Sequence, residues 1–140
     1  MYKIKILTIG KTKENWLEEA LEEYYKRLKS TAQIELVFAK DNTQLLSMVE
    51  KNDSIVALDA SGEPMDSVSF SRFLLEKLEK GGSRLTFVVG GAEGLSAAIK
   101  KSHPLISLSP LTFTHQIVRL ILVEQIYRAF EIEKGSKYHK

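Results

Sequence analysis

Glycine residues gather in the stretch GGAEGLS, residues 90–96, directly after a run of β-forming residues. Glycines at the end of a strand are typical of a ligand site, because a backbone without Cβ atoms lets a ligand approach closely. The spacing G-G-x-x-G fits neither the dinucleotide fingerprint G-x-G-x-x-G nor the phosphate loop G-x-x-x-x-G-K-[ST]. The loop alone is equally compatible with a tight turn in which glycines supply positive φ and nothing binds.

A second loop, SPLTFTHQ at residues 109–116, follows the last predicted strand. In open parallel sheets ligands bind outside the carboxyl ends of the strands, so we expect both loops at one edge of the sheet, forming one pocket. The loops offer backbone amides, small hydroxyls and the apolar side chains of Leu108, Leu111 and Phe113. Such a pocket suits a neutral, adenine-like ring better than a triphosphate.

The chain ends on KGSKYHK, in which Tyr138 and His139 stand among three lysines. One interpretation is a free basic tail that frays, and composition alone favours it. The other is an RNA contact, because basic side chains neutralise phosphates and aromatic side chains stack on unpaired bases.

Length and composition limit the class of protein. The 140 residues, 44% of them hydrophobic, suffice for one core, so we expect a single domain over residues 1–140. A formal charge of +2 neither indicates nor excludes nucleic acid. The absence of cysteine excludes disulfides and thiolate chemistry, and no metal is expected. With no signal sequence and no apolar run long enough to span a bilayer, we expect a soluble, cytoplasmic protein.

Predicted strands and predicted helices alternate along the chain, and they position the loops at residues 90–96 and 109–116. Short β-rich runs are each followed by a stretch with helical periodicity. The runs are IKILTI, IELVFA, SIVALD, RLTFVVG and LISLS. Because they are almost continuously apolar, the sheet should be covered on both faces. The sequence predicts an α/β domain with a mostly parallel, five- to six-stranded sheet flanked by helices.

Two helices carry specific expectations. The segment 16–30 has one apolar stripe, which begins at Trp16 and predicts a surface helix. The stretch from Ile117 to Phe130 is apolar on nearly every face, so we expect it to be buried on all sides, with a partner subunit covering part of it. An intramolecular core helix is the alternative. Glu124 and Arg128 are spaced to pair along this helix.

Five motifs together resemble the bacterial 23S ribosomal RNA pseudouridine N3-methyltransferases of the SPOUT class. They are IGK near the start, ALDASG at the end of the third predicted strand, FVVGGAEGLS, LSPLTFTHQIVRLILVEQIYRAF and the terminal KGSKYHK. The resemblance covers essentially the whole chain, and the last two motifs are highly specific. Ala92 departs from the pattern, since many members carry proline or serine there.

The resemblance implies a SPOUT-type fold with a C-terminal trefoil knot, a homodimer, and S-adenosylmethionine as methyl donor. It places the donor against Leu58, Gly90 and the segment from Leu108 to Phe113. That segment comprises Leu108, Ser109, Pro110, Leu111, Thr112 and Phe113. It also implies ribosomal RNA as the acceptor, within assembled ribosomes, and places the terminal Tyr-His near the donor pocket.

Methylation of a ring imide nitrogen requires loss of its N–H before or during attack on the sulfonium methyl. Histidine is the side chain type whose ordinary pKa lies closest to neutral pH. We therefore expect His139 to act as the base, with Tyr138 positioning it. We expect Arg128, or alternatively Arg119, to stabilise the developing imide charge.

Two other functions remain open at this point. One is a non-catalytic α/β module that binds RNA or a nucleotide. The other is a SPOUT enzyme that acts on transfer RNA, although such enzymes usually append an RNA-binding domain and this chain has no residues to spare for one.

Overall fold

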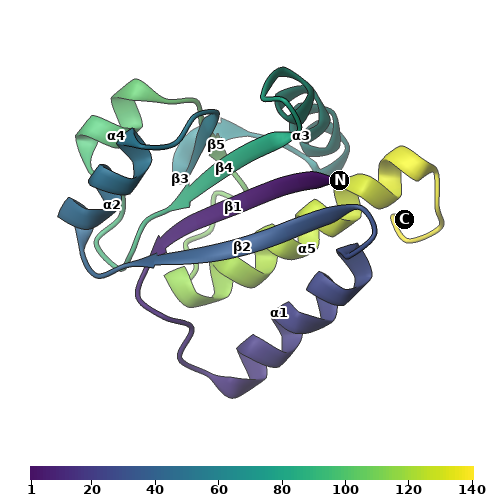
Figure 1. Cartoon of the computed structure of the whole chain (residues 1–140), viewed down its shortest axis with the longest axis horizontal. Coiled ribbons are helices and arrows are strands. Elements are labelled where there is room, and N and C mark those ends of the chain that lie inside the picture. The colour runs from purple at the N-terminus through teal and green to yellow at the C-terminus, as the bar shows by residue number, and fades with distance from the viewer.

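The computed structural model describes residues 1–140 and contains five strands that alternate with five helices (Figure 1). The strands are β1 (Tyr2–Ile9), β2 (Ala32–Ala39), β3 (Ile55–Pro64), β4 (Arg84–Val89) and β5 (Leu105–Ser107). The helices are α1 (Asn15–Leu28), α2 (Asn42–Glu50), α3 (Ser67–Lys80), α4 (Ala97–Ser102) and α5 (His115–Lys134). All five predicted β-runs are therefore confirmed as strands.

The five strands form one sheet in the order β2-β1-β4-β3-β5, and every neighbouring pair is parallel. The register between β1 and β2 runs without a break from Tyr2–Ala32 to Ile9–Ala39. Pairing between β3 and β5 shifts between Leu58 and Glu63, so the intervening residues leave the ladder. The predicted parallel α/β sheet is confirmed, with five strands.

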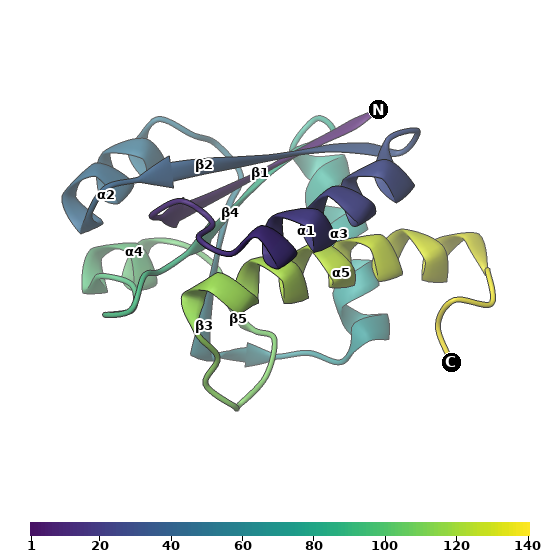
Figure 2. The same cartoon turned by 90° about the horizontal axis from the view of Figure 1, so that it is seen from below.

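Helices cover both faces of the sheet, as the continuous apolar strands predict. One buried cluster joins Ile4 and Ile6 of β1 to the inner faces of α1, α3 and α5. The other joins Leu7 to α2 and α4. Successive strand residues point to opposite faces, so a strand buried on both sides has no polar face. Figure 2 shows α1 and α5 side by side on their face of the sheet.

Local signals fix the ends of the helices. The Asp66 carboxylate accepts a hydrogen bond from the Ser69 amide and caps α3, and Gly81 ends that helix. The Thr114 hydroxyl caps α5 in the same way. Gly135 ends α5 at a φ of 72°, a left-handed conformation that favours glycine.

Helix α5 is buried on one face by its own chain. Leu122, Val123, Ile126, Ala129 and Phe130 are fully or almost fully buried against the sheet, α1 and α3. Ile117, by contrast, is 39% exposed. The expectation that the helix is buried on all sides is therefore not met within one chain, because only its inner face meets α1, α3 and the sheet.

Trp16 corrects a second expectation. It begins the apolar stripe of α1 in the sequence, but its side chain is 56% exposed, whereas Leu17, Leu21 and Leu28 are buried. Trp16 lies in the first turn of α1 and lines a cavity instead of packing in the core. None of the helices is long and apolar enough to cross a membrane.

The inner face of α5 should be essential for folding. We expect Ile126→Ala to lower the free energy of unfolding by about 2–5 kcal/mol, because it leaves a cavity beneath a fully buried side chain. Urea denaturation at one fixed protein concentration measures this. Val68→Ala on the exposed side of α3 is the control and should change stability by less than about 0.5 kcal/mol. An equal loss in both variants would contradict this assignment of the core.

Candidate functional site

A cavity of about 920 Å³ opens at the carboxyl edge of the sheet, where β3, β4 and β5 end. It brings together nearly all the residues that the resemblance implies for the donor. Leu58, Gly90, Leu108, Ser109, Leu111, Thr112 and Phe113 all line it. Pro110 belongs to the same segment but is not among the lining residues. Two loops that are far apart in the sequence therefore form one pocket, as the position of the strand ends predicts.

The glycine loop is held tightly by its own backbone. A Cβ atom at Gly90 would lie 2.8 Å from the carbonyl carbon of Gly94 and 2.9 Å from the amide nitrogen of Leu95. The Gly94 amide donates to the Gly91 carbonyl, and Gly94 has a φ of 78°. Glycine is therefore required at both positions by the turn itself, in addition to any ligand that approaches it.

The ALDASG motif supplies another wall of the cavity. Asp59 and Ala60 line the cavity at the point where β3 leaves its pairing with β5. The strand returns at Gly62, where a Cβ would lie 2.7 Å from the backbone of Leu105 and Ile106. The close contact at Gly62 thus lets the Asp59 segment turn out toward the cavity and rejoin the sheet.

The loop before α5 is braced by short side chains. Ser107 donates its hydroxyl to the Ser109 carbonyl, and the Ser109 hydroxyl accepts from the Leu111 amide. These bonds leave Leu111 and Phe113 exposed at the cavity, at 68% and 37%. An exposed apolar rim of this kind marks a surface that a ligand or partner covers.

The charges of the cavity decide which ligands it suits. Its charged side chains are the carboxylates of Glu14 and Asp59, and no lysine or arginine lines it. Burial disfavours ionisation of Asp59, but hydrogen bonds from Ser61 and the nearby Lys100 outweigh it and lower the pKa of the carboxyl. Burial, with the charge of Arg119, lowers the pKa of His115, so its ring is neutral near pH 7. A polyphosphate would meet repulsion here, whereas a cationic or neutral ligand would not.

The C-terminal tail docks on α5 and does not fray. The Tyr138 hydroxyl donates to a carboxylate oxygen of Glu124 at 2.6 Å, and its ring packs edge-on against Tyr127. Arg128 pairs with Glu124 at 2.9 Å, as its spacing predicts, and lies over the Tyr138 ring. His139 Nδ1 lies 3.1 Å from an amino nitrogen of Arg128. The structure therefore joins the three predicted catalytic residues in one cluster around Glu124.

These contacts set the protonation of the cluster. Burial and the hydrogen bond to Glu124 raise the pKa of Tyr138, so its phenol stays protonated. The hydrogen bond to Glu124 raises the pKa of Arg128, which keeps its charge. An arginine has donors only, so Arg128 must donate to His139 Nδ1. The neutral His139 ring then carries its proton on Nε2.

The cavity and the tail cluster lie at opposite ends of α5. Ile117 lines the cavity and Arg128 belongs to the tail cluster. At a rise of about 1.5 Å per residue, these two positions are about 16 Å apart along the helix. Figure 2 shows the first turn of α5 near β3 and β5 and the C-terminus beyond its far end. One chain alone therefore does not bring His139 to its own cavity.

Arg119, the alternative to Arg128 for stabilising charge, is fully buried. Its guanidinium donates to the carbonyls of Ile9 and Gly10 and to the Thr12 hydroxyl. It is therefore engaged inside the chain and is not available to a ligand.

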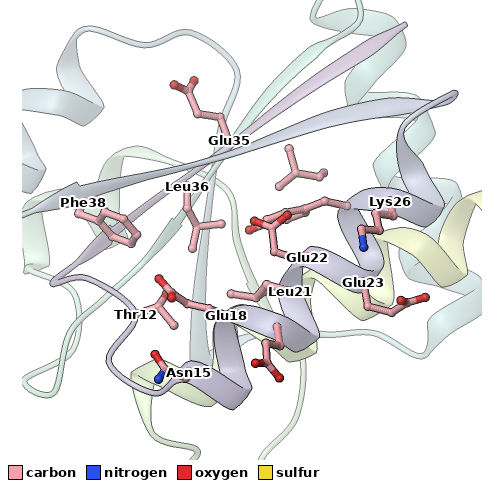
Figure 3. A pocket seen from close by; sticks show the side chains of 13 residues that line it. Thr12, Asn15, Glu18, Leu21, Glu22, Glu23, Lys26, Glu35, Leu36 and Phe38 are labelled. Carbon is pink, nitrogen blue, oxygen red and sulfur yellow. The ribbon is translucent and has the colours of Figure 1, made fainter.

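A second cavity, of about 810 Å³, lies between α1 and β2 (Figure 3). Its lining includes five glutamates but only one basic side chain, Lys26. The glutamates are Glu18, Glu19, Glu22, Glu23 and Glu35. Tyr25 also lines this cavity. Burial and the nearby Glu22 raise the pKa of its hydroxyl to about 12. This acidic cavity repels nucleic acid phosphates, so it is not suited to bind RNA. No group of three or more histidine, aspartate or glutamate side chains is placed to hold a metal ion.

Gly90→Ala tests the glycine loop. We expect the added methyl to displace the Gly94–Leu95 backbone, to cost about 1–3 kcal/mol of stability and to abolish binding of the donor that the resemblance implies, S-adenosylmethionine. Calorimetric titration and thermal unfolding measure the two effects. Glu93→Ala, in the same loop but exposed and outside the cavity lining, should leave both unchanged. If Gly90→Ala retained full affinity for the donor, the ligand would have to bind elsewhere than at this loop.

Comparisons with known proteins identify the family. The family model described as "Predicted SPOUT methyltransferase" matches residues 2–139. A "Ribosomal RNA large subunit methyltransferase H" from Protochlamydia amoebophila is 57% identical over 140 residues, which is the full length of both chains. Proteins of the same name from Halothermothrix orenii and Streptococcus uberis are 40% and 39% identical, over 99% of this chain and 99% of theirs.

A solved structure agrees on the fold. The crystal structure of TrmJ from Z. mobilis ZM4 matches 92% of this chain and 70% of its own, with a TM-score of 0.53 at 9% sequence identity. At that identity the likeness concerns the fold alone. The match of the family model over nearly the whole chain, together with the full-length identity to its relatives, shows that this chain belongs to the SPOUT methyltransferase family.

Proposed function

We propose that the protein transfers a methyl group from S-adenosylmethionine to the N3 of a pseudouridine in 23S ribosomal RNA, within assembled ribosomes. The observation that carries the proposal is the cavity at the strand ends, which is lined by apolar groups and by carboxylates without any lysine or arginine. The full-length relatives named as large-subunit ribosomal RNA methyltransferases support the choice of acceptor.

The chemistry of the cavity fits this donor. S-adenosylmethionine supplies an electrophilic methyl group on a positively charged sulfur. Leu58, Leu108 and Phe113 would hold its adenine ring between apolar walls, and backbone groups of the glycine loop would bind its polar edge. Glu14 and Asp59 would favour its positive charges.

The tail cluster supplies the groups that act on the acceptor. Tyr138 stays protonated, so it positions the cluster through Glu124 and does not act as a base. Arg128 keeps its charge and would stabilise the anion that forms on the imide. His139 becomes a base at Nδ1 once the substrate draws Arg128 away from that nitrogen. Until then, the Nε2–H of His139 can donate a hydrogen bond to a carbonyl oxygen of the pseudouridine ring.

The separation of cavity and tail supports a homodimer in which each active site takes the cavity of one subunit and the tail of the other. A two-fold axis would carry the tail cluster of one chain to the cavity of its partner. The exposed Ile117 and the rim residues Leu111 and Phe113 offer apolar surface for such a contact. The trefoil knot implied by the resemblance and the cytoplasmic location stay predictions.

A large preformed RNA surface suits an enzyme of this size. The chain is one domain and carries only a small net positive charge, so a single short RNA would gain little electrostatic binding energy. The tail lysines beside Tyr138 and His139 provide local contacts for phosphate and base. A SPOUT enzyme for transfer RNA is less well supported, because the full-length relatives carry a ribosomal name.

Methyl transfer to RNA tests the proposal directly. With labelled S-adenosylmethionine, we expect incorporation into the 23S RNA of intact ribosomes at one pseudouridine, and much less into the naked RNA. His139→Ala should lower the rate by about 10²-fold or more while donor affinity stays unchanged. Donor binding without transfer to any ribosomal particle would support the non-catalytic module, and transfer to transfer RNA alone would reassign the acceptor.

Mixed dimers test whether the site is shared between subunits. We expect a dimer of one Gly90→Ala subunit and one His139→Ala subunit to regain about half of the wild-type rate, because one of its two sites combines an intact cavity with an intact tail. Each variant alone should be nearly inactive. If the mixed dimer is as inactive as its parents, cavity and tail act within one chain.

A further inference from the structure

The segment between β1 and α1 has no role in the chemistry described so far, although it contains the IGK motif. Gly10 lies there at a φ of 76°, and a Cβ at this position would meet nothing within 4 Å. The glycine is therefore required by the backbone conformation and not by close packing. Its turn directs the carbonyls of Ile9 and Gly10 toward the same guanidinium group.

Two side chains of α5 bind this segment from end to end. Arg119 donates to the Ile9 carbonyl at 2.9 Å, to the Gly10 carbonyl at 2.7 Å and to the Thr12 hydroxyl at 3.1 Å. Gln116, one turn earlier, donates to the Lys11 carbonyl and accepts from the Lys13 amide, both at 3.1 Å. Every residue from Ile9 to Lys13 is thus fixed against the first turns of α5. We call these five hydrogen bonds the α5 clamp.

The residues that follow the clamp reach the cavity. Glu14 and Trp16 line it, together with Gln116 itself. The Glu14 side chain makes no capping hydrogen bond at the start of α1, and the Trp16 side chain is 56% exposed. Leu17, in the same turn, is buried and anchors the helix itself. The α5 clamp fixes the backbone that leads into this wall from the other side, from Ile9 to Lys13.

We propose that Trp16 contacts the bound methyl donor and that Gln116 and Arg119 are positioning residues that hold Trp16 at the cavity. This inference rests on the proposed function, since it takes the cavity to be the donor site. An aromatic ring on one wall gives a bound nucleoside a flat apolar surface, and a clamp that is already formed avoids the cost of ordering that wall on binding.

The single tryptophan of the chain makes the proposal measurable, because all indole emission comes from Trp16. We expect S-adenosylhomocysteine, the demethylated donor, to change this emission in a saturable way, with the midpoint that calorimetry gives for binding. Trp16→Ala should weaken binding by roughly tenfold, and Trp16→Phe should restore it to within about threefold of wild type.

Gln116→Ala should weaken binding by about three- to tenfold and reduce the emission change at saturation. In a Trp16→Ala background the same substitution should cost less than about twofold, because its effect acts through Trp16. Gln125→Ala is the matched control: Gln125 is another half-buried glutamine of α5, but it bonds to Ser67 and Glu124 at a distance from the cavity. It should leave affinity and emission unchanged.

The outcomes separate this inference from the proposed function. If the wild type binds S-adenosylhomocysteine but Trp16 emission does not respond, and the affinity losses of Trp16→Ala and Gln116→Ala simply add, the positioning role is wrong while the donor site stands. If the wild type binds no S-adenosylhomocysteine at all, the donor assignment fails and this inference fails with it.

Discussion

The rigid length of α5 is the constraint on which the functional arrangement depends. The helix has 20 residues, and its inner face forms part of the main core. Its first turn lines the cavity, and its last turns bind the tail through Glu124 and Arg128. Because a packed helix does not shorten, the cavity and the tail cluster of one chain are kept apart. In the proposed dimer, the tail of one chain would lie at the cavity of its partner.

The two substrates of the proposed reaction meet parts of the molecule with opposite charge. The cavity has carboxylates and a neutral histidine, which suit a positively charged donor and exclude a polyphosphate. The tail has lysines around Tyr138 and His139, which suit an RNA backbone and an unstacked base. The groove between α1 and β2 is acidic, so RNA should not bind there. The molecule thus separates a site for a cationic small molecule from a site for a polyanion.

Most of the fold and much of the cavity could be predicted from the sequence. Continuous apolar runs predict a sheet covered on both faces, and the ends of parallel strands must bring residues 90–96 and 109–114 together. The pairing of Glu124 with Arg128 follows from helical spacing. The particular donor, acceptor and catalytic residues came from the resemblance, since glycine loops and basic tails are compatible with many functions.

Three features could not be predicted from the sequence, each for a physical reason. Trp16 looks like a core residue by periodicity, but its side chain is largely exposed in the wall of a cavity, where no other part of this chain covers it. Arg119 looks like a possible substrate contact, but its partners are main-chain carbonyls whose approach no residue pattern encodes. The tail docks because the Tyr138 ring packs against Tyr127 and its hydroxyl bonds to Glu124. These contacts depend on the tertiary structure. The amino-acid composition of the tail is compatible with both a free and a docked conformation, so it could not distinguish them.

In the proposed dimer, each active site combines the cavity of one subunit with the tail of the other. A crystal structure of the protein with S-adenosylhomocysteine would test this arrangement. We expect a two-fold dimer in which the ligand sulfur lies within reach of the His139 side chain from the second chain, while the His139 of the chain that binds the ligand stays at the far end of its own α5. A bound monomer, or a ligand with its own chain's His139 beside the sulfur, would contradict it.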